Sequence, residues 1–255
     1  MQLSFEDRTY LVTGGGSGIG KGVAAALVAS GANVMLMGRN ADRLAAAADE
    51  IKAAGSGEVN HEAADITDED AVARVVAAVI AWRGKLDGVL HSAGGSHTIG
   101  PITQIDSELW RSTVDLNING TMYVLKHSAR EMVRSGGGSF VGISSIAAGN
   151  THRWFGAYGP GKSALEALVK LAADELGPSW VRVNAIRPGL TRTEMVEPIM
   201  QLPAALEDYR QCTPIPRVGE VEDIANLALF LLSDAASYIT GPAINVDGGH
   251  GLRRG

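Results

Sequence analysis

The sequence has little of what marks a secreted, membrane or nucleic-acid-binding protein. Its single cysteine, Cys212, cannot form a disulfide within the chain, which favours a reducing compartment. The first apolar stretch, Tyr10–Thr13, is too short for the core of a signal peptide. The uncharged stretch Val23–Gly38 is divided by Gly31 and its polar neighbours, so neither half could span a bilayer. Basic residues do not dominate, because the formal net charge is −6. We therefore expect a cytoplasmic protein with no membrane or nucleic-acid partner.

The composition is that of a folded protein. Its 255 residues, 45% hydrophobic and 20% charged, are enough to bury a large core. Short strand-like runs alternate with longer helical ones. The predicted strands are Thr9–Thr13, Asn33–Met37, Val59–Ala64, Leu86–Ser92, Ser139–Ile143, Val181–Ile186 and Ala243–Val246. The predicted helices are Ile19–Ala29, Asp42–Ala54, Asp68–Trp82, Asp106–Arg134 (one bent helix or two abutting ones), Tyr158–Leu176 and Glu220–Leu232.

This alternation predicts an α/β fold with a mostly parallel, seven-stranded sheet flanked by helices. We predict a single domain over residues 1–255, with one irregular insertion at residues 189–216 that holds four prolines and forms a lid over the substrate. An eight-stranded barrel has a similar length and alternation. However, a glycine cluster directly follows the first strand, which favours a doubly wound, Rossmann-type sheet with its ligand at the carboxyl ends of the strands.

The glycine cluster, Thr13–Gly20, fits the pattern T-G-x-x-x-G-x-G through Gly14, Gly18 and Gly20. It does not fit G-x-G-x-x-G. In either pattern a strand turns sharply into a helix while its backbone N–H groups approach a pyrophosphate, and side chains would block both the turn and the approach. A glycine-rich turn without a ligand is the alternative, which the strand–loop–helix context disfavours.

Two residues at the ends of later strands concern the choice of nucleotide. Arg39 follows the second strand, where an arginine pairs with a 2′-phosphate and an acidic residue binds a free ribose hydroxyl. We therefore expect NADP(H) as the preferred cofactor, with NAD(H) as the alternative if Arg39 is only a solvated surface residue. Asp65, after the third strand, is a candidate to accept from the adenine amino group, or it leads into the next helix.

A phenol and an ammonium group stand four residues apart at Tyr158 and Lys162, on one face of a helix if the helix has begun there. A tyrosine is a poor base at neutral pH, but a neighbouring cation favours phenolate, so the pair could exchange a proton with a substrate. Ser145 lies thirteen residues before Tyr158, and Asn117 lies within the long helical segment, where asparagine is a poor helix former.

Taken together, these motifs resemble the classical short-chain dehydrogenase/reductase family. The resemblance runs from the glycine motif to Asn245–Gly249, almost the whole chain, and includes Arg187-Pro188-Gly189 followed by Thr193. The joint occurrence of the motifs is far more specific than any one of them.

The resemblance implies roles for these residues. Tyr158 would exchange a proton with the substrate oxygen, and Lys162 would lower the pKa of Tyr158 and hold the nicotinamide ribose. Ser145 would bind the carbonyl, and Asn117 would support a water that relays protons through Lys162. The expected cofactor-binding residues are Gly14, Ser17, Gly18, Ile19, Arg39, Asp65, Ile66, Gly94, Tyr158, Lys162, Pro188, Gly189 and Thr193. No metal site is expected.

The chain also departs from the family pattern. Many relatives carry N-N-A-G after the fourth strand, where this chain has His91-Ser92-Ala93-Gly94. We interpret His91 as a hydrogen-bonded residue that supports the sheet rather than as a catalyst. Many NADP-preferring relatives carry a basic residue where Ser17 stands, so Arg39 alone supports NADP(H).

The resulting hypothesis is an oxidoreductase that transfers hydride between NADP(H) and a carbonyl or secondary alcohol, with an acyl thioester among the candidate substrates. The alternatives are an NAD-linked sugar or steroid alcohol dehydrogenase, an enoyl-thioester reductase, and a catalytically silent nucleotide-binding scaffold. By analogy with the family we expect a homotetramer. Three loops, residues 95–100, 147–157 and 189–216, should converge over the substrate, with Trp154 and Phe155 as an apolar wall and Arg153 able to meet an anionic tail.

Overall fold

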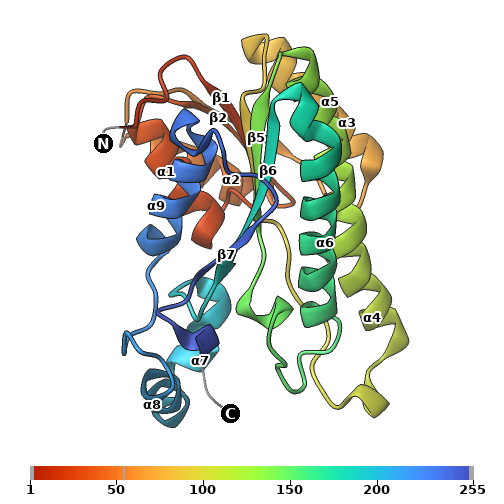
Figure 1. Ribbon diagram of the computed structural model, residues 1–255, viewed down its shortest axis with the longest axis vertical. Helices are drawn as coiled ribbons and strands as arrows, with labels where there is room; N and C mark the ends of the chain where they lie inside the picture. The colour runs from red at the N-terminus through yellow and green to blue at the C-terminus, as the bar shows by residue number, and fades with distance from the viewer. Residues whose placement is uncertain (1–2, 54, 253–255) are drawn as a thin grey trace.

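The computed structural model describes residues 3–53 and 55–252, and it contains a seven-stranded sheet between two layers of helices (Figure 1). The strands are β1 (Thr9–Thr13), β2 (Asn33–Gly38), β3 (Val59–Ala63), β4 (Gly88–His91), β5 (Gly138–Ile143), β6 (Val181–Pro188) and β7 (Ala243–Val246). Their order across the sheet is β3-β2-β1-β4-β5-β6-β7, and every neighbouring pair is parallel. The predicted fold class is therefore confirmed.

Each face of the sheet carries its own apolar core. The helices α1 (Gly18–Ala29), α2 (Ala41–Lys52) and α9 (Val221–Leu232) pack on one face, and α3 (Glu69–Arg83), α5 (Gly120–Arg134) and α6 (Tyr158–Leu176) on the other. All five residues of β1 are buried, as expected of a central parallel strand covered on both sides. The chain runs outward from β1 to β3 and then returns to β4. This reversal opens a crevice at the carboxyl ends of β1 and β4.

The predicted helix boundaries hold to within a few residues, and the predicted end of the second helix at Ala54 lies outside the described residues. The predicted long helix is α4 (Ser107–Val114), a π-helical turn (Asp115–Asn119) and α5, which follow one another without a break. Asn117 lies in that turn. A single turn of π-helix inside a longer helix is a frequent feature of functional sites.

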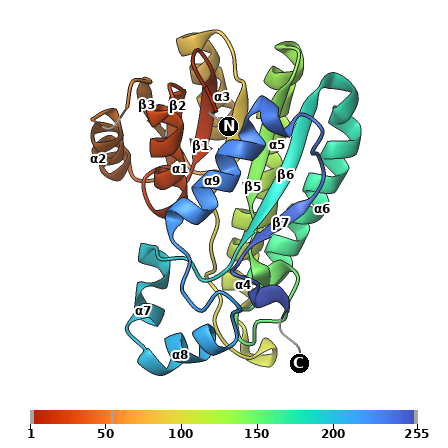
Figure 2. The same cartoon turned by 60° about the vertical axis from the view of Figure 1, so that its left-hand side comes forward.

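The insertion at residues 189–216 is less irregular than predicted, because it contains the helices α7 (Glu197–Met200) and α8 (Pro203–Gln211) (Figure 2). The prolines predicted an irregular segment, but two of them begin helices. Pro198 and Pro203 stand in the first turns of these helices, where a missing backbone N–H leaves no hydrogen bond unmade. Among the described residues, no helix combines the length and apolar character needed to cross a membrane.

Helices α1 and α9 pack closely because Gly22 faces Val221, the first residue of α9. A Cβ atom at Gly22 would overlap Cγ1 of Val221 and lie 3.4 Å from its Cβ. The sequence therefore uses a glycine inside a helix, where alanine is ordinarily favoured by about 1 kcal/mol, to bring the two helices together.

We predict that Gly22→Ala lowers the free energy of unfolding by about 1–3 kcal/mol, because overpacking outweighs the gain in helix propensity. In a Val221→Ala background, where the overlapping methyl is gone, the same substitution should cost nothing or stabilise the protein. Urea denaturation of the four proteins measures the difference. An equal loss in both backgrounds would show that this contact does not decide the helix spacing.

Candidate active site

The turn between β1 and α1 is built from glycines that no other residue could replace without strain. Gly14 and Gly18 adopt left-handed φ angles of 67° and 52°. A Cβ at Gly14 would lie 3.0 Å from the backbone nitrogen of Ala93, and one at Gly20 would overlap the carbonyl oxygen of Gly14. The first backbone N–H groups of α1 therefore stay open to an anion at the carboxyl edge of the sheet.

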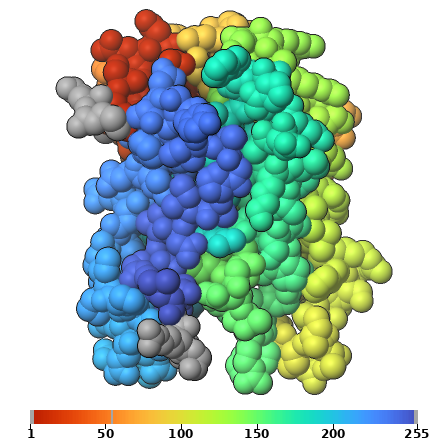
Figure 3. Space-filling view, in the orientation of Figure 1, coloured from red at the N-terminus to blue at the C-terminus, as the bar shows by residue number. Residues whose placement is uncertain are grey.

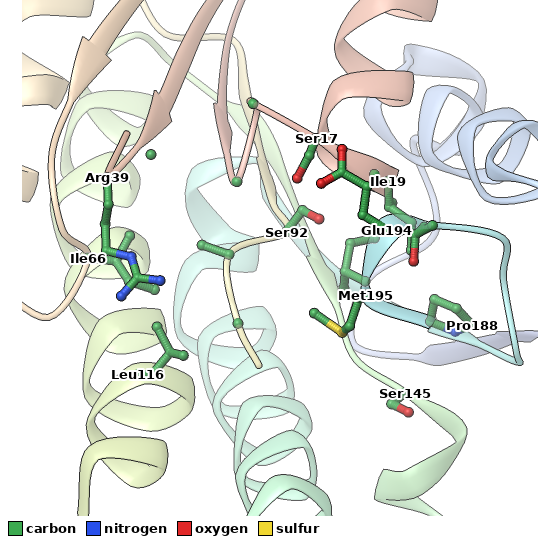
Figure 4. Close-up of a pocket in the computed structure, with 18 of the residues that line it drawn as sticks. Ser17, Ile19, Arg39, Ile66, Ser92, Leu116, Ser145, Pro188, Glu194 and Met195 are labelled. Atoms are coloured by element: carbon green, nitrogen blue, oxygen red, sulfur yellow. The ribbon is translucent and has the colours of Figure 1, made fainter. Parts of the chain in front are cut away.

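A cleft of about 390 Å³ runs along this edge. All of the predicted cofactor-binding residues line it, and so does Ser145; their binding to a nucleotide remains a prediction. In Figure 4, Arg39 and Ile66 lie toward one end of the cleft and Ser145 and Pro188 toward the other. The elongated shape and the glycine turn between its ends fit an extended dinucleotide.

Tyr158 is the first residue of α6, and Lys162 lies one turn further on, as the spacing predicted. The Lys162 Nζ atom lies 5.8 Å from the centroid of the Tyr158 ring. Burial raises the pKa of Tyr158, and its hydrogen bond with Ser145 partly opposes this effect. Burial rather than the neighbouring ammonium is therefore the dominant influence on Tyr158, in contrast to the expected lowering by Lys162.

Lys162 is itself buried, with 4% of its surface exposed, and its Nζ donates a 2.7 Å hydrogen bond to the Ile143 carbonyl. Burial lowers the pKa of Lys162 to about 8. A Cβ at Gly94 would lie 2.8 Å from this Nζ and 2.9 Å from Oδ1 of Asn117. Glycine at position 94 thus allows the ammonium and the asparagine amide to approach the same point of the loop after β4, where a side chain would displace both.

Asn117 does not line the cleft directly but is held firmly behind it. Its Nδ2 donates to the carbonyl oxygens of Gly95, at 2.7 Å, and Thr113, at 2.8 Å, while its Oδ1 accepts from the Gly95 backbone N–H at 3.3 Å. The side chain is almost fully buried. The structure therefore brings Asn117, Ser145, Tyr158 and Lys162 together around one end of the cleft.

The two serines after β5 differ in their partners, as strand alternation predicts. The Ser144 hydroxyl donates to Glu166 at 2.6 Å, and Glu166 also accepts from Arg187. Ser145 caps a short 3₁₀ turn by accepting from the Ala147 N–H at 3.1 Å, and it contacts Tyr158. Of the two hydroxyls, that of Ser145 is the one beside Tyr158.

Two arginines, Arg39 and Arg43, are among the residues that line the cleft. Arg39 is exposed, and its side chain extends past Ile66 in Figure 4. Asp65 is partly engaged, because one carboxylate oxygen accepts from both the backbone N–H and the hydroxyl of Thr67, each at 2.9 Å. The next helix is capped by Asp68 and not by Asp65. An adenine amino group would therefore have only part of the Asp65 carboxylate to bind.

Sequence reasoning missed the ion pair between Arg43 of α2 and Glu194 of the insertion, whose side chains approach within 2.5 Å. Both residues line the cleft, and the pair joins its two rims. No local pattern marks this pairing, because the partners are 151 positions apart. Among the described residues, no group of three or more His, Cys, Asp or Glu side chains could hold a metal ion.

The mouth of the site is formed by loops far apart in the sequence. The Gly100 N–H donates to the Trp154 carbonyl at 2.8 Å, and the Ala157 N–H donates to the Thr98 hydroxyl at 3.0 Å. Two of the three predicted loops are therefore joined, while the insertion lines the cleft from the other rim. In the space-filling view the insertion (light blue) and the segments near residues 100 (yellow) and 150 (green) project along the lower edge (Figure 3).

The two joined loops expose apolar side chains. The side chains of Trp154 and Phe155 are 59% and 42% exposed, and the Arg153 guanidinium lies 5.5 Å from the centre of the Trp154 ring. A neighbouring isoleucine, Ile99, is 89% exposed. Such clustered apolar exposure is typical of a binding surface.

Comparison with known proteins relates this chain to enzymes. A family model described as enoyl-(acyl carrier protein) reductase matches residues 14–251. The chain is 37% identical over 244 residues to the 2,5-dichloro-2,5-cyclohexadiene-1,4-diol dehydrogenase of Sphingobium indicum, covering 95% of this chain and 96% of that one. It is 34% identical over 249 residues to the 7alpha-hydroxysteroid dehydrogenase of Escherichia coli, covering 97% and 95%. The solved structure of a short-chain type dehydrogenase/reductase from Mycobacterium ulcerans matches with a TM-score of 0.97 and 69% identity, covering 99% and 93%.

The burial of Lys162 predicts how stability depends on pH. Its pKa of about 8 in the folded protein lies below that of an unfolded lysine, so between these values the unfolded chain binds more protons. Stability therefore rises with pH in this window. Relative to Lys162→Met, the wild type should gain about 2 kcal/mol of unfolding free energy between pH 7.5 and pH 10.

Urea denaturation at several pH values measures this gain in the protein without nucleotide. Lys170→Met, which removes an exposed lysine of the same helix, is the matched control. If wild type and Lys162→Met change in parallel over this range, the ammonium is not desolvated as described.

Proposed function

This chain belongs to the classical short-chain dehydrogenase/reductase family, whose members act on alcohols and carbonyls with NAD(H) or NADP(H), and we propose that it interconverts a carbonyl compound and a secondary alcohol with NADP(H). The observation that carries this proposal is the meeting of Ser145, Tyr158 and Lys162 in the cleft that begins at the glycine turn. A nucleotide-binding scaffold without catalysis would not need this set.

Tyr158 is the proposed general acid and base. A substrate oxygen that approaches Tyr158 also meets the Ser145 hydroxyl, because both residues line the cleft and Ser145 is near enough to Tyr158 to affect its pKa. Ser145 would hold this oxygen while Tyr158 gives it a proton during reduction or takes one during oxidation. When bound, the nicotinamide supplies or accepts the hydride at the substrate carbon.

Lys162 would act in two ways. Its pKa of about 8 means that it loses and regains a proton near neutral pH more readily than an exposed lysine, which suits a group that re-supplies Tyr158. We propose that it also holds the nicotinamide ribose, and that Asn117 supports the water through which protons reach Lys162. The Lys162 Nζ and the Asn117 amide both lie close to Gly94, and this proximity supports a proton route from Asn117 to Lys162.

We propose that the dinucleotide lies along the cleft with its adenosine toward Arg39. Gly14, Ser17, Gly18 and Ile19 would surround the pyrophosphate at the start of α1. The further proposed contacts are Asp65, Ile66 and Gly94 on one side and Pro188, Gly189 and Thr193 on the other. The exposed guanidinium of Arg39 supports a 2′-phosphate, and hence NADP(H) rather than NAD(H), because it is free to form charge-assisted hydrogen bonds.

We propose a ring-bearing secondary alcohol, or the corresponding ketone, as substrate. The names of the relatives from Sphingobium indicum and Escherichia coli describe alcohols on a cyclohexadiene and on a steroid. The apolar mouth with Trp154 and Phe155 supports a hydrophobic substrate of this kind. An enoyl or 3-oxoacyl thioester is the second candidate, supported by the description of the family model and by the exposed Arg153, which could meet an anionic carrier.

Three further proposals concern the whole molecule. We propose one domain over residues 1–255, in which residues 189–216 form the lid. We propose a cytoplasmic homotetramer. A surface groove between α5 and α6, lined by Leu125, Val133, Leu168 and Leu171 among others, supports association of subunits through these helices.

Tyr158→Phe should lower kcat by about 10²–10⁴-fold, because the proton donor is lost while the ring still fills its place. NADPH oxidation with a panel of cyclic ketones and 3-oxoacyl thioesters measures this effect. NADPH binding, followed by its fluorescence, should change little and serves as the control. Equal turnover by wild type and Tyr158→Phe would remove Tyr158 from the mechanism.

Arg39→Asp should weaken NADPH binding by about 10–100-fold, because a charge-assisted pairing is replaced by repulsion. NADH binding should be unchanged or tighter, since an acidic residue at this position accepts from a free ribose hydroxyl. Arg74→Asp, on the exposed side of α3, controls for the change in net charge. If Arg39→Asp alters both nucleotides equally, NADP(H) preference is refuted.

A further inference from the structure

Four buried side chains connect the sheet to the π-helical turn. Thr13 ends β1, His91 ends β4, Thr121 lies in the first turn of α5, and Asn117 lies in the turn before it. The Thr13 hydroxyl lies 2.9 Å from His91 Nδ1, and the Thr121 hydroxyl lies 3.0 Å from His91 Nε2. All four residues are at most 1% exposed. The proposed function gives no role to His91 or to either threonine.

The positions of the protons in this series of hydrogen bonds can be assigned. The Thr121 hydroxyl donates its only proton to the Asn117 carbonyl at 2.7 Å, so it must accept the hydrogen bond from His91 Nε2. His91 therefore carries its proton on Nε2, and its Nδ1 accepts from the Thr13 hydroxyl. Thr13 in turn accepts from the backbone N–H of Ala93 at 3.2 Å. Of the two neutral tautomers of His91, only the Nε2–H form lets all four hydrogen bonds exist at once.

The surroundings keep His91 uncharged. Burial, and to a lesser extent the positive charge of Lys162, lowers the pKa of His91 to about 3. Its ring also stacks on Phe140, with centroids 6.0 Å apart. The imidazole is therefore a fixed bridge that stays uncharged at neutral pH.

Both ends of this series of hydrogen bonds reach residues beside the cleft. Ala93 lines the cleft, and its backbone packs against Gly14 of the glycine turn. At the other end, Thr121 donates to the Asn117 carbonyl. The side chain of Asn117 and the ammonium of Lys162 both lie close to Gly94. The two imidazole nitrogens point to opposite sides of one ring, so a single side chain can join a hydroxyl of the sheet to a hydroxyl of α5.

We propose that His91, as the neutral Nε2–H tautomer, is a positioning residue that fixes the Asn117 carbonyl through Thr121 and the Ala93 backbone through Thr13. Its effect on turnover rests on the proposed function, because it acts through the proposed role of Asn117. The tautomer itself does not depend on that function and is measured separately.

The first experiment observes the tautomer without substrate or nucleotide. Long-range ¹H–¹⁵N spectra of protein labelled at its six histidines distinguish Nε2–H, Nδ1–H and doubly protonated rings. The signal missing from His91→Asn identifies His91. We expect a neutral Nε2–H ring throughout pH 5–8. An Nδ1–H ring, or protonation within this range, would overturn the proposal.

The second experiment compares Thr121→Val, which removes the hydroxyl at nearly constant volume, with Thr121→Ser, which keeps it. We expect kcat to fall about tenfold in Thr121→Val while KM for ketone and for NADPH changes by less than about twofold. Thr121→Ser should stay within about twofold of wild type. Circular dichroism establishes that equal amounts of folded protein are compared.

The outcomes separate this proposal from the function on which it rests. If Thr121→Val is merely less stable, with wild-type kcat when folded, the positioning role is wrong. If the wild type oxidises or reduces none of the substrate classes, the proposed function fails, and the tautomer still decides whether the hydrogen-bond chain exists as described.

Discussion

The site depends on keeping one ammonium group out of water. Lys162 is buried at the edge of the sheet, where its Nζ has the Ile143 carbonyl as a protein acceptor. A buried cation is costly unless its remaining hydrogen bonds are met. The surrounding elements meet this requirement. The last residue of β5 presents its carbonyl to Lys162, and α6 begins one turn before Lys162. Gly94 leaves room for the lysine side chain. The same desolvation that destabilises the charged form brings the lysine's pKa toward the range in which proton transfer is useful.

The topology explains why these groups meet. The glycine turn follows β1, Gly94 follows β4, Ser145 follows β5 and Pro188 ends β6, and parallel strands bring their carboxyl ends to one edge. Residues more than 170 positions apart therefore line one cleft, and a few of them, such as Leu44, Ile66 and Ile143, also belong to the apolar cores beneath it. The π-helical turn adds a contribution from the helical layer, because it brings the Asn117 side chain to the loop after β4.

The sheet and the cluster of Ser145, Tyr158 and Lys162 were predictable because their signals are local. A run of apolar residues such as Leu11–Val12, a glycine cluster after a strand, or a fixed spacing between a phenol and an amine is visible within a few residues. The helices α7 and α8 were not predicted, since their prolines resemble breakers until the helix starts are known. The pairing of Arg43 with Glu194 and the partners of His91 depend on tertiary packing, which no short pattern records. The direction of the pKa shift of Tyr158 was missed for a similar reason, because burial is a property of the folded chain.

The two apolar cores lie on the faces of the sheet, whereas Trp154, Phe155 and Ile99 surround the mouth and belong to neither core. Exchanges among these exposed residues leave the buried packing untouched and so cost little folding stability. Substitutions at these exposed positions can therefore change which substrate binds, while the residues of the site itself stay the same. Relatives at 34–37% identity whose names describe a steroid and a chlorinated diene are the outcome expected of such a division.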